Sequence, residues 1–137
     1  MSRLIMALVC LSTWGCDGVK VPAGLSLTDV VYGGCAGEQL QRATPDSGDS
    51  GEPESLTVTS DGPGTIQVLH LNVPDECCLE HEIALSEAGT TLTVEYEAKG
   101  DPCDCICSFD YSFTVSGLEP GTWTVQAGNS SSTVQVD

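Results

Sequence analysis

The chain has 137 residues and a formal net charge of −16, from twenty acidic and four basic residues. Such a polyanion repels nucleic acid and anionic lipid surfaces, which argues against both as binding partners. The length allows one small domain. We interpret the acidic surface as one that keeps the protein soluble. A calcium-attracting surface is the weaker interpretation, because the sequence has no loop of the EF-hand form.

The first fifteen residues have the pattern of a secretory signal. A cationic start, Met1-Ser2-Arg3, precedes an apolar run over residues 4–11, which is too short to span a bilayer as a helix. The run ends at Ser12-Thr-Trp-Gly-Cys16, and a small residue before a cysteine at this place resembles the bacterial lipoprotein signal. That resemblance implies lipidation of Cys16 and attachment through the lipid to the bacterial cell envelope, at the outer membrane or the periplasmic face. Thr13, where such signals usually have Leu, is a departure, and ordinary signal cleavage a few residues later is the alternative.

Two segments of the mature chain lack a strand pattern. Residues 16–27 contain Gly18, Pro22 and Gly24 without periodicity, and we expect them to form a tether behind the lipidated cysteine. Residues 44–55 hold acidic and small residues but no apolar side chain, which predicts a flexible surface loop. The folded domain is therefore expected to span residues 28–137.

From residue 56 onward, apolar residues recur with the period of two that is typical of strands. The run at 65–73 is apolar on both faces, as in a strand that is covered on both sides. Ile66 and Val68 lie on one face, and Leu69, Leu71 and Val73 on the other. The run at 90–98 is expected to turn four side chains inward: Leu92, Val94, Tyr96 and Ala98. The other inward-facing sets are Leu56 and Val58, then His81, Ile83 and Leu85, then Phe109, Tyr111, Phe113 and Val115, and finally Trp123, Val125, Val134 and Val136. A shorter strand is expected at residues 28–32.

Turn signals separate these runs. Glu87-Ala88-Gly89 has the length and the glycine of a hairpin turn, and residues 118–121 and 128–131 also carry turn residues. Seven or eight short strands with turns between them predict an all-β protein. The expected fold is a single small β-sandwich of the immunoglobulin-like or Greek-key type.

Six cysteines are left once Cys10, inside the signal, and the lipidated cysteine are set aside. An even number in an exported chain of this size is typical of a disulfide framework, with fifteen possible pairings. In an extended segment, Cys103, Cys105 and Cys107 share a face with Phe109. Strand neighbours two apart lie about 6.5 to 7 Å between Cα atoms, which disfavours bridges within the segment. We therefore expect three bridges from it to the other three cysteines, which are Cys35, Cys77 and Cys78.

A thiolate metal site is the competing interpretation of the same cysteines. Their concentration near two histidines suits Cu(I) or zinc. The ligand set would be Cys77, Cys78, Cys103, Cys105, Cys107 and His70. Against it, the C-x2-C spacing of zinc fingers is missing, and an exported compartment favours oxidised cysteine. His81 lies on an apolar strand face, where a packed core side chain is the more common role.

One further resemblance rests on the order of the cysteine motifs. Gly34-Cys35, Cys77-Cys78 and Cys103-Asp-Cys-Ile-Cys107-Ser-Phe-Asp110, followed by Leu118-Glu-Pro-Gly-Thr-Trp-Thr-Val125, resemble a group of uncharacterised bacterial lipoproteins. The similarity covers about residues 28–127, and the triple-cysteine motif is its most specific part. The resemblance implies export, lipidation and an all-β domain, and it brings no activity with it.

Catalytic motifs are missing from the sequence. It has no G-x-S-x-G elbow, no H-E-x-x-H helix, no phosphate-binding glycine loop and no C-x-x-C redox motif. We therefore expect a non-enzymatic lipoprotein without a cofactor, acting as a structural or protein-interaction module. Metal handling by the cysteines is the alternative. A partner protein could join the exposed edge of a sheet, for which Leu56 to Ser60 is the best candidate strand.

Overall fold

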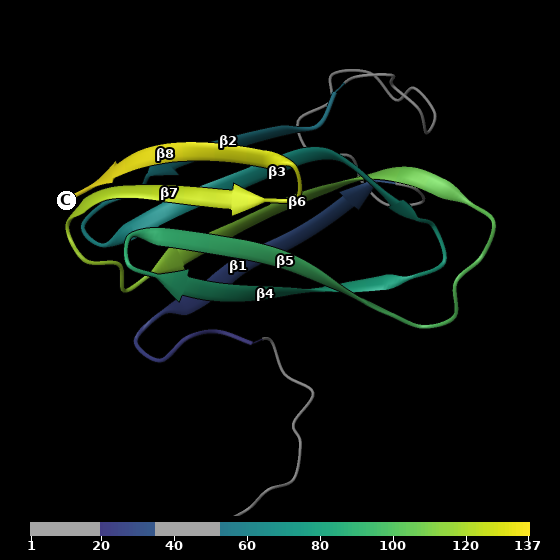
Figure 1. Ribbon diagram of the computed structural model, residues 1–137, viewed down its shortest axis with the longest axis horizontal. Helices are drawn as coiled ribbons and strands as arrows, with labels where there is room; N and C mark the ends of the chain where they lie inside the picture. The colour runs from purple at the N-terminus through teal and green to yellow at the C-terminus, as the bar shows by residue number, and fades with distance from the viewer. Residues whose placement is uncertain (1–19, 35–52) are drawn as a thin grey trace, which may run out of the picture.

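The computed structural model describes residues 20–34 and 53–137, which form eight β-strands and no helix (Figure 1). This confirms the all-β prediction. The strands are β1 (Ser26–Gly34), β2 (Ser55–Ser60), β3 (Thr65–Glu76), β4 (Glu80–Ala88), β5 (Thr91–Lys99), β6 (Ile106–Ser116), β7 (Gly121–Ala127) and β8 (Ser130–Val136).

The strands form two four-stranded sheets. One sheet has the order β1-β6-β3-β2 and the other the order β4-β5-β7-β8, and β1 runs diagonally behind β4 and β5 in Figure 1. The chain changes sheet after β3, after β5 and after β6. Strand β6 thereby returns beside β3, which is a connection of the Greek-key type. The pair β5 and β7 is parallel, whereas every other strand pair is antiparallel.

The two sheets bury one apolar core between them. Its members come from both sheets and follow the period-two pattern of the sequence. The most deeply buried aliphatic and aromatic side chains are Ile66, Val68, Ile83, Leu92, Val94, Tyr111, Phe113, Val115, Val125 and Val136. The indole of Trp123 is also buried, and its Nε1 donates a hydrogen bond of 2.8 Å to the carbonyl oxygen of Glu119.

A β-bulge divides β3 into two parts. His70 lies opposite Tyr111 in β6, but Val73 lies opposite Phe109, so that two residues of β3 face the single residue Asp110. The extra residue changes which side chains face inward. Ile66, Val68 and His70 point into the core before the bulge, and Val73 joins them after it.

Asn72 provides the backbone geometry of this bulge. Its φ of 58° lies in the left-handed region, which asparagine tolerates better than most residues. The Asn72 backbone N–H donates a 3.0 Å hydrogen bond to Oδ1 of Asp110, a buried side chain. The side-chain amide nitrogen of Asn72, Nδ2, donates a second hydrogen bond, of 3.3 Å, to the carbonyl oxygen of Pro53. The N–H that leaves the strand ladder is thus satisfied by a carboxylate.

Some details of the strand predictions were wrong. We predicted Val73 on the same face as Leu69 and Leu71, but the bulge turns it inward, and the two leucines are only half-buried. The expected inward set of β5 loses its last member, because Ala98 is exposed, whereas the half-buried Tyr96 packs against the core as expected.

The segment before β1 lies against the sandwich. We expected residues 16–27 to form a tether, yet the Lys20 carbonyl accepts a 2.8 Å hydrogen bond from the Leu85 backbone N–H of β4. The side chains of Val21, Leu25 and Leu27 pack against the core, and the burial of their apolar surface holds this part of the chain against the sandwich. Of the predicted loop at 44–55, residues 44–52 lie outside the described part of the chain. Ser55 begins β2.

The bulge predicts an unusual order of stability at Asn72. Alanine there keeps the left-handed strain of about 1 to 2 kcal/mol, whereas glycine removes it. Both variants lose the side-chain bond to Pro53. We expect Asn72→Gly to be more stable than Asn72→Ala by about 1 kcal/mol in urea unfolding.

Gln67, an exposed residue of the same strand, is the matched control. In the regular part of a strand, glycine is less stable than alanine, so Gln67→Ala should be more stable than Gln67→Gly by about 0.5 to 1 kcal/mol. The same order at both positions would contradict the role assigned to the bulge.

Candidate functional site

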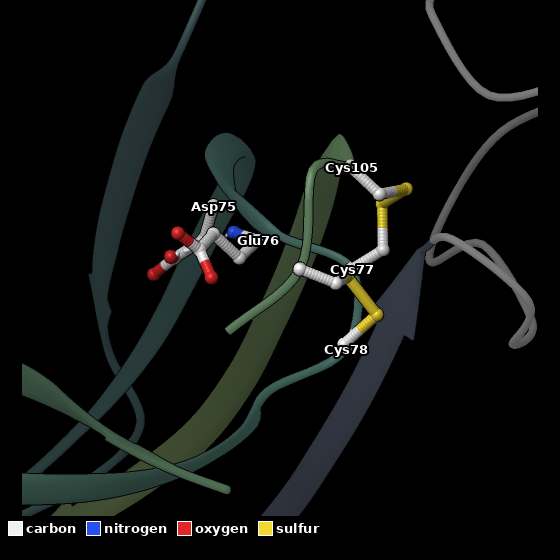
Figure 2. Close-up of a disulfide and its surroundings, with 6 residues drawn as sticks. Asp75, Glu76, Cys77, Cys78 and Cys105 are labelled. Atoms are coloured by element: carbon white, nitrogen blue, oxygen red, sulfur yellow. Dashed lines mark hydrogen bonds between the residues drawn. A yellow bond between two sulfur atoms is a disulfide. The ribbon is translucent and has the colours of Figure 1, made fainter. Parts of the chain in front are cut away.

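Two disulfides fasten one end of the sandwich. Cys77 and Cys78 follow β3 directly, and the segment before β6 supplies their partners, Cys105 and Cys103. Figure 2 shows Cys77, Cys78 and Cys105 at this end of the sandwich. The bridge Cys77–Cys105 joins Cα atoms 5.3 Å apart, and the bridge Cys78–Cys103 joins Cα atoms 5.9 Å apart. The connection from β3 to β4 is thereby tied to the connection from β5 to β6.

The register of β3 and β6 explains the first bridge. Glu76 lies opposite Ile106, and the Cys77 backbone N–H continues the pairing with a 2.9 Å hydrogen bond to the Cys105 carbonyl oxygen. Residues that face one another across antiparallel strands have the Cα separation that a disulfide needs. The prediction that the adjacent cysteines bridge to the triple-cysteine segment is confirmed for these two pairs.

One part of the cysteine prediction was wrong. We expected a strand from residue 103, with all three cysteines on the face of Phe109. Strand β6 begins only at Ile106, so Cys103 and Cys105 lie in the irregular connection before it. That connection is free to turn each sulfur toward its partner, which a regular strand would not allow.

Cys107 is also disulfide-bonded, and the other four described cysteines are paired with one another. The remaining predicted partner, Cys35, lies outside the described residues, as does Cys16. Gly34, the chain neighbour of Cys35, lies opposite Phe109 in β6, two residues from Cys107. The sequence predicted three bridges without assigning their pairs, and with four cysteines paired, a bridge between Cys35 and Cys107 is the remaining possibility within that prediction, which stays untested.

The metal alternative would require these bridges to be reduced, because a disulfide sulfur is no thiolate ligand. Within residues 20–34 and 53–137, no group of three or more His, Cys, Asp or Glu side chains has the spacing to hold a metal ion. His70, the proposed sixth ligand, lies in the sandwich interior, where both of its ring nitrogens are engaged.

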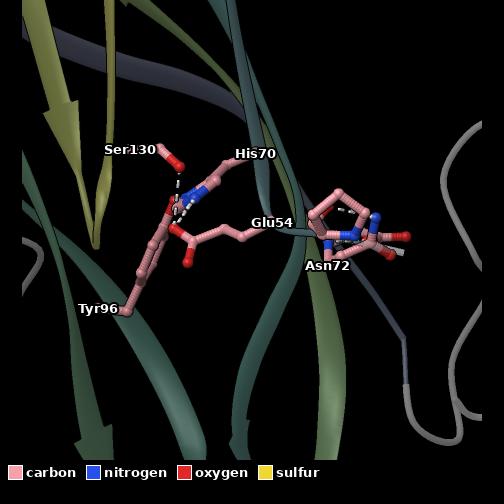
Figure 3. A network of polar contacts seen from close by, with 7 residues as sticks. Glu54, His70, Asn72, Tyr96 and Ser130 are labelled. Atoms are coloured by element: carbon pink, nitrogen blue, oxygen red, sulfur yellow. Dashed lines mark hydrogen bonds and ion pairs between the residues drawn. The ribbon is translucent and has the colours of Figure 1, made fainter. Parts of the chain in front are cut away.

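His70 is the centre of a buried polar network (Figure 3). Its Nδ1 lies 2.7 Å from the Tyr96 hydroxyl, and its Nε2 lies 2.7 Å from Oε1 of Glu54. The Ser130 hydroxyl donates a 3.3 Å hydrogen bond to the same Glu54 oxygen. His70 has no exposed surface, and four elements meet at it. These are strands β3, β5 and β8 and the segment that precedes β2.

The protonation of this network follows from its partners. Burial lowers the pKa of His70, and the Glu54 carboxylate opposes this only in part. Burial also raises the pKa of Tyr96, with smaller contributions from Tyr111 and Glu54. At neutral pH the Tyr96 O–H therefore donates to Nδ1 of a neutral His70, and the His70 Nε2–H donates to Glu54. The hydrogen bonds fix the tautomer.

A groove of about 510 Å³ borders this network, because Glu54 and Tyr96 also line the groove. Its walls come from β3, β5 and the β7–β8 turn, and it is lined by Tyr96 and by the three carboxylates Glu54, Asp75 and Glu95. None of the described Lys or Arg residues lines it. The two described lysines make ion pairs elsewhere: Lys20 with Glu97 at 2.8 Å and Lys99 with Glu82 at 2.9 Å. We call this feature the acidic groove.

His81 occupies the neighbouring part of the interior, on the inner face of β4, as predicted. Its ring packs edge-on against Phe109, with centroids 4.9 Å apart. Its Nε2 lies 3.0 Å from Oδ2 of Asp75, in an orientation that does not form a hydrogen bond. His81 is therefore a packed interior residue, close to one wall of the acidic groove.

Four important residues were not recognised in the sequence. Glu54 belongs to a stretch that we expected to be a flexible loop, and Asp110 occupies a position that regular alternation turns outward. Asn72 continues the alternation of Ile66, Val68 and His70, which gives no sign of a bulge. Tyr96 was expected only as a core residue. The one available signal was His70 within an otherwise apolar strand, since a buried histidine requires polar partners.

The comparisons with known proteins identify no relative. No protein-family model matches this chain, and neither a curated protein nor a solved structure is significantly similar to it. Residues 20–34 and 53–137 contain no helix that is long and apolar enough to cross a membrane.

The buried histidine predicts a pH dependence of stability. Its pKa is lowered in the folded state, so the unfolded chain binds the extra proton as the pH falls through the ordinary histidine value near 6.5. Stability supplied by neutral His70 is present above that value and is lost below it, at up to about 1.4 kcal/mol per pH unit. We expect this loss between pH 6.5 and 5.5 in urea unfolding, and we expect His70→Gln to lack it.

His81→Gln is the control for the histidine prediction, because it removes a histidine from the same interior and leaves His70 in place. This variant should keep the wild-type loss between pH 6.5 and 5.5. Equal pH profiles for wild type and His70→Gln would contradict the assignment.

The bridge Cys77–Cys105 closes a long loop, since its cysteines are 28 residues apart in sequence. Replacing both cysteines with alanine should lower the free energy of unfolding by about 2 to 5 kcal/mol. The measurement is urea unfolding of the oxidised protein. Reduced wild type should be at least as unstable as the variant, and an unchanged unfolding midpoint would contradict a stabilising role.

Proposed function

We propose that this protein is an exported, lipid-anchored binding module of the bacterial cell envelope, which acts through protein interaction rather than catalysis. The proposal joins the N-terminal signal pattern, with Cys16 as the lipidated residue, to a β-sandwich whose cysteines are oxidised. The lipid would hold the protein to the membrane, and the sandwich would face the space outside the cytoplasm.

The observation that carries the proposal is the pair of bridges Cys77–Cys105 and Cys78–Cys103. Disulfides form and persist in exported proteins and are rare in the reducing cytosol. A small domain also gains much of its stability from such bridges, because its core is limited in size. The cysteines thus support both export and a structural role.

The acidic groove supports an interaction role. Its three carboxylates line a hollow that is open to solvent, and none of the described lysines lines it. Complementary charge speeds association and selects partners, which favours a basic segment of a partner protein. Strand β2 is an edge strand next to this region, since Glu54 precedes it directly, and it offers the sheet edge that we expected for a partner.

The anchor is tested by fatty-acid labelling in a bacterial host. Wild-type protein should incorporate labelled palmitate and sediment with membranes, whereas Cys16→Ser should lose the label and become soluble. Cys10→Ser is the matched control, because this cysteine lies inside the apolar run, and it should keep the label. Unlabelled wild-type protein would contradict lipid anchoring.

The interaction role is tested in the same cells with a carbodiimide, which couples carboxylates directly to lysines. Wild-type protein should give a discrete adduct, and Glu95→Lys, which reverses one charge of the acidic groove, should lose it. Glu87→Lys changes an exposed acidic residue at the far end of the β4–β5 hairpin and should keep the adduct. An adduct insensitive to Glu95→Lys would overturn the groove as the docking surface.

A further inference from the structure

A second cavity, of about 330 Å³, lies where the sandwich is open between β1 and β4. These are the outer strands of the two sheets on that side. The size falls in the range of small-ligand sites. Its lining residues are Tyr32, Leu79, Glu80, His81, Phe109 and Tyr111. We call it the aromatic pocket.

The wall of this pocket is rigidly built. The Tyr111 ring stacks on Tyr96 with centroids 3.9 Å apart, and the Tyr32 ring meets its edge at 5.7 Å. Leu79 and Glu80 follow Cys78, whose bridge to Cys103 fixes the start of β4. A pocket whose walls are held by ring packing and a disulfide loses little conformational freedom when a ligand binds.

Tyr111, one of the lining residues, carries an unusual hydroxyl. Tyr111 has no exposed surface, yet its hydroxyl has no hydrogen-bond partner among the described residues. A buried hydroxyl without a partner costs free energy, so native structures nearly always satisfy one. A ligand with a polar group at this place would supply the missing bond.

The charges around the pocket are mostly negative. Glu80 lines it directly. Burial and then the Asp75 carboxylate raise the pKa of Tyr111, and burial and then Glu82 raise the pKa of Tyr32. The basic groups on this side are Lys99, which is paired with Glu82 at 2.9 Å, and the ring of His81 next to Asp75. A positive ligand is therefore favoured over a neutral or a negative one.

We propose that the aromatic pocket binds a small organic amine in its ammonium form. The ammonium group donates hydrogen bonds to the Tyr111 hydroxyl oxygen and to the Glu80 carboxylate. The apolar body of the amine lies against Phe109, Leu79 and the Tyr32 ring, whose π-face also attracts the cation. This site is separate from the acidic groove and does not depend on the lipid anchor.

The test is an NMR titration of the full chain carrying Cys16→Ser, with its bridges oxidised. The probe is 2-phenylethylamine. A ligand of this size should bind with a Kd between about 0.1 and 10 mM. Its neutral analogue, 2-phenylethanol, and its anionic analogue, 3-phenylpropionate, should bind at least tenfold more weakly. No saturable shift with the amine, or equal affinity for the alcohol, would overturn the proposal.

Tyr111→Phe removes only the hydroxyl and keeps the stacked ring. It should weaken amine binding about tenfold while the thermal midpoint stays equal or rises, because an unsatisfied buried group is removed. Glu80→Gln should weaken binding as well, whereas Glu119→Gln, an exposed acidic residue of the β6–β7 turn, should leave it unchanged. Unaltered affinity in Tyr111→Phe would overturn the assigned contact.

Discussion

The hydrogen bond from the Asn72 backbone to Asp110 is the interaction on which this end of the sandwich depends. It allows one extra residue to enter β3 without leaving a buried N–H unsatisfied. With that residue, His70 faces Tyr111 before the bulge and Cys77 pairs with Cys105 after it. Without it the pairing would shift by one residue, and Cys77 would face Asp104.

The same bulge lies between two parts of the interior that differ in how they are packed. On one side of it lie aliphatic layers that need no polar partners. At the bulge and beyond it, the sheets enclose histidines and tyrosines, and the packing is supplemented by hydrogen bonds, ring contacts and disulfides. Cavities occur where large aromatic rings and strand ends meet, which is why both described hollows lie beyond the bulge.

The strands were predictable because their side chains alternate over six to twelve residues. The adjacent cysteines also pointed to bridges with the triple-cysteine segment. The bulge was not predictable, since Asn72 and Asp110 are common in exposed loops and only tertiary contact shows that they are buried. The role of Glu54 was not predictable for the same reason. No alternating pattern marks this residue, and its role arises from a hydrogen bond to a histidine sixteen residues later. The aromatic pocket depends on strand order, which alternation does not encode.

The position of the bridges also decides how the protein would respond to mechanical load. A pull transmitted from the N-terminus first reaches the segment from Lys20, which is hydrogen-bonded to β4, and then β1, an outer strand whose one partner among the described strands is β6. The segment from Lys20 would be released first, and β1 would then be the first strand to peel. The bridge Cys77–Cys105 then removes the 28-residue stretch between its cysteines from the extensible length, about 100 Å of chain. The domain would yield at its first strand and resist at its bridged end.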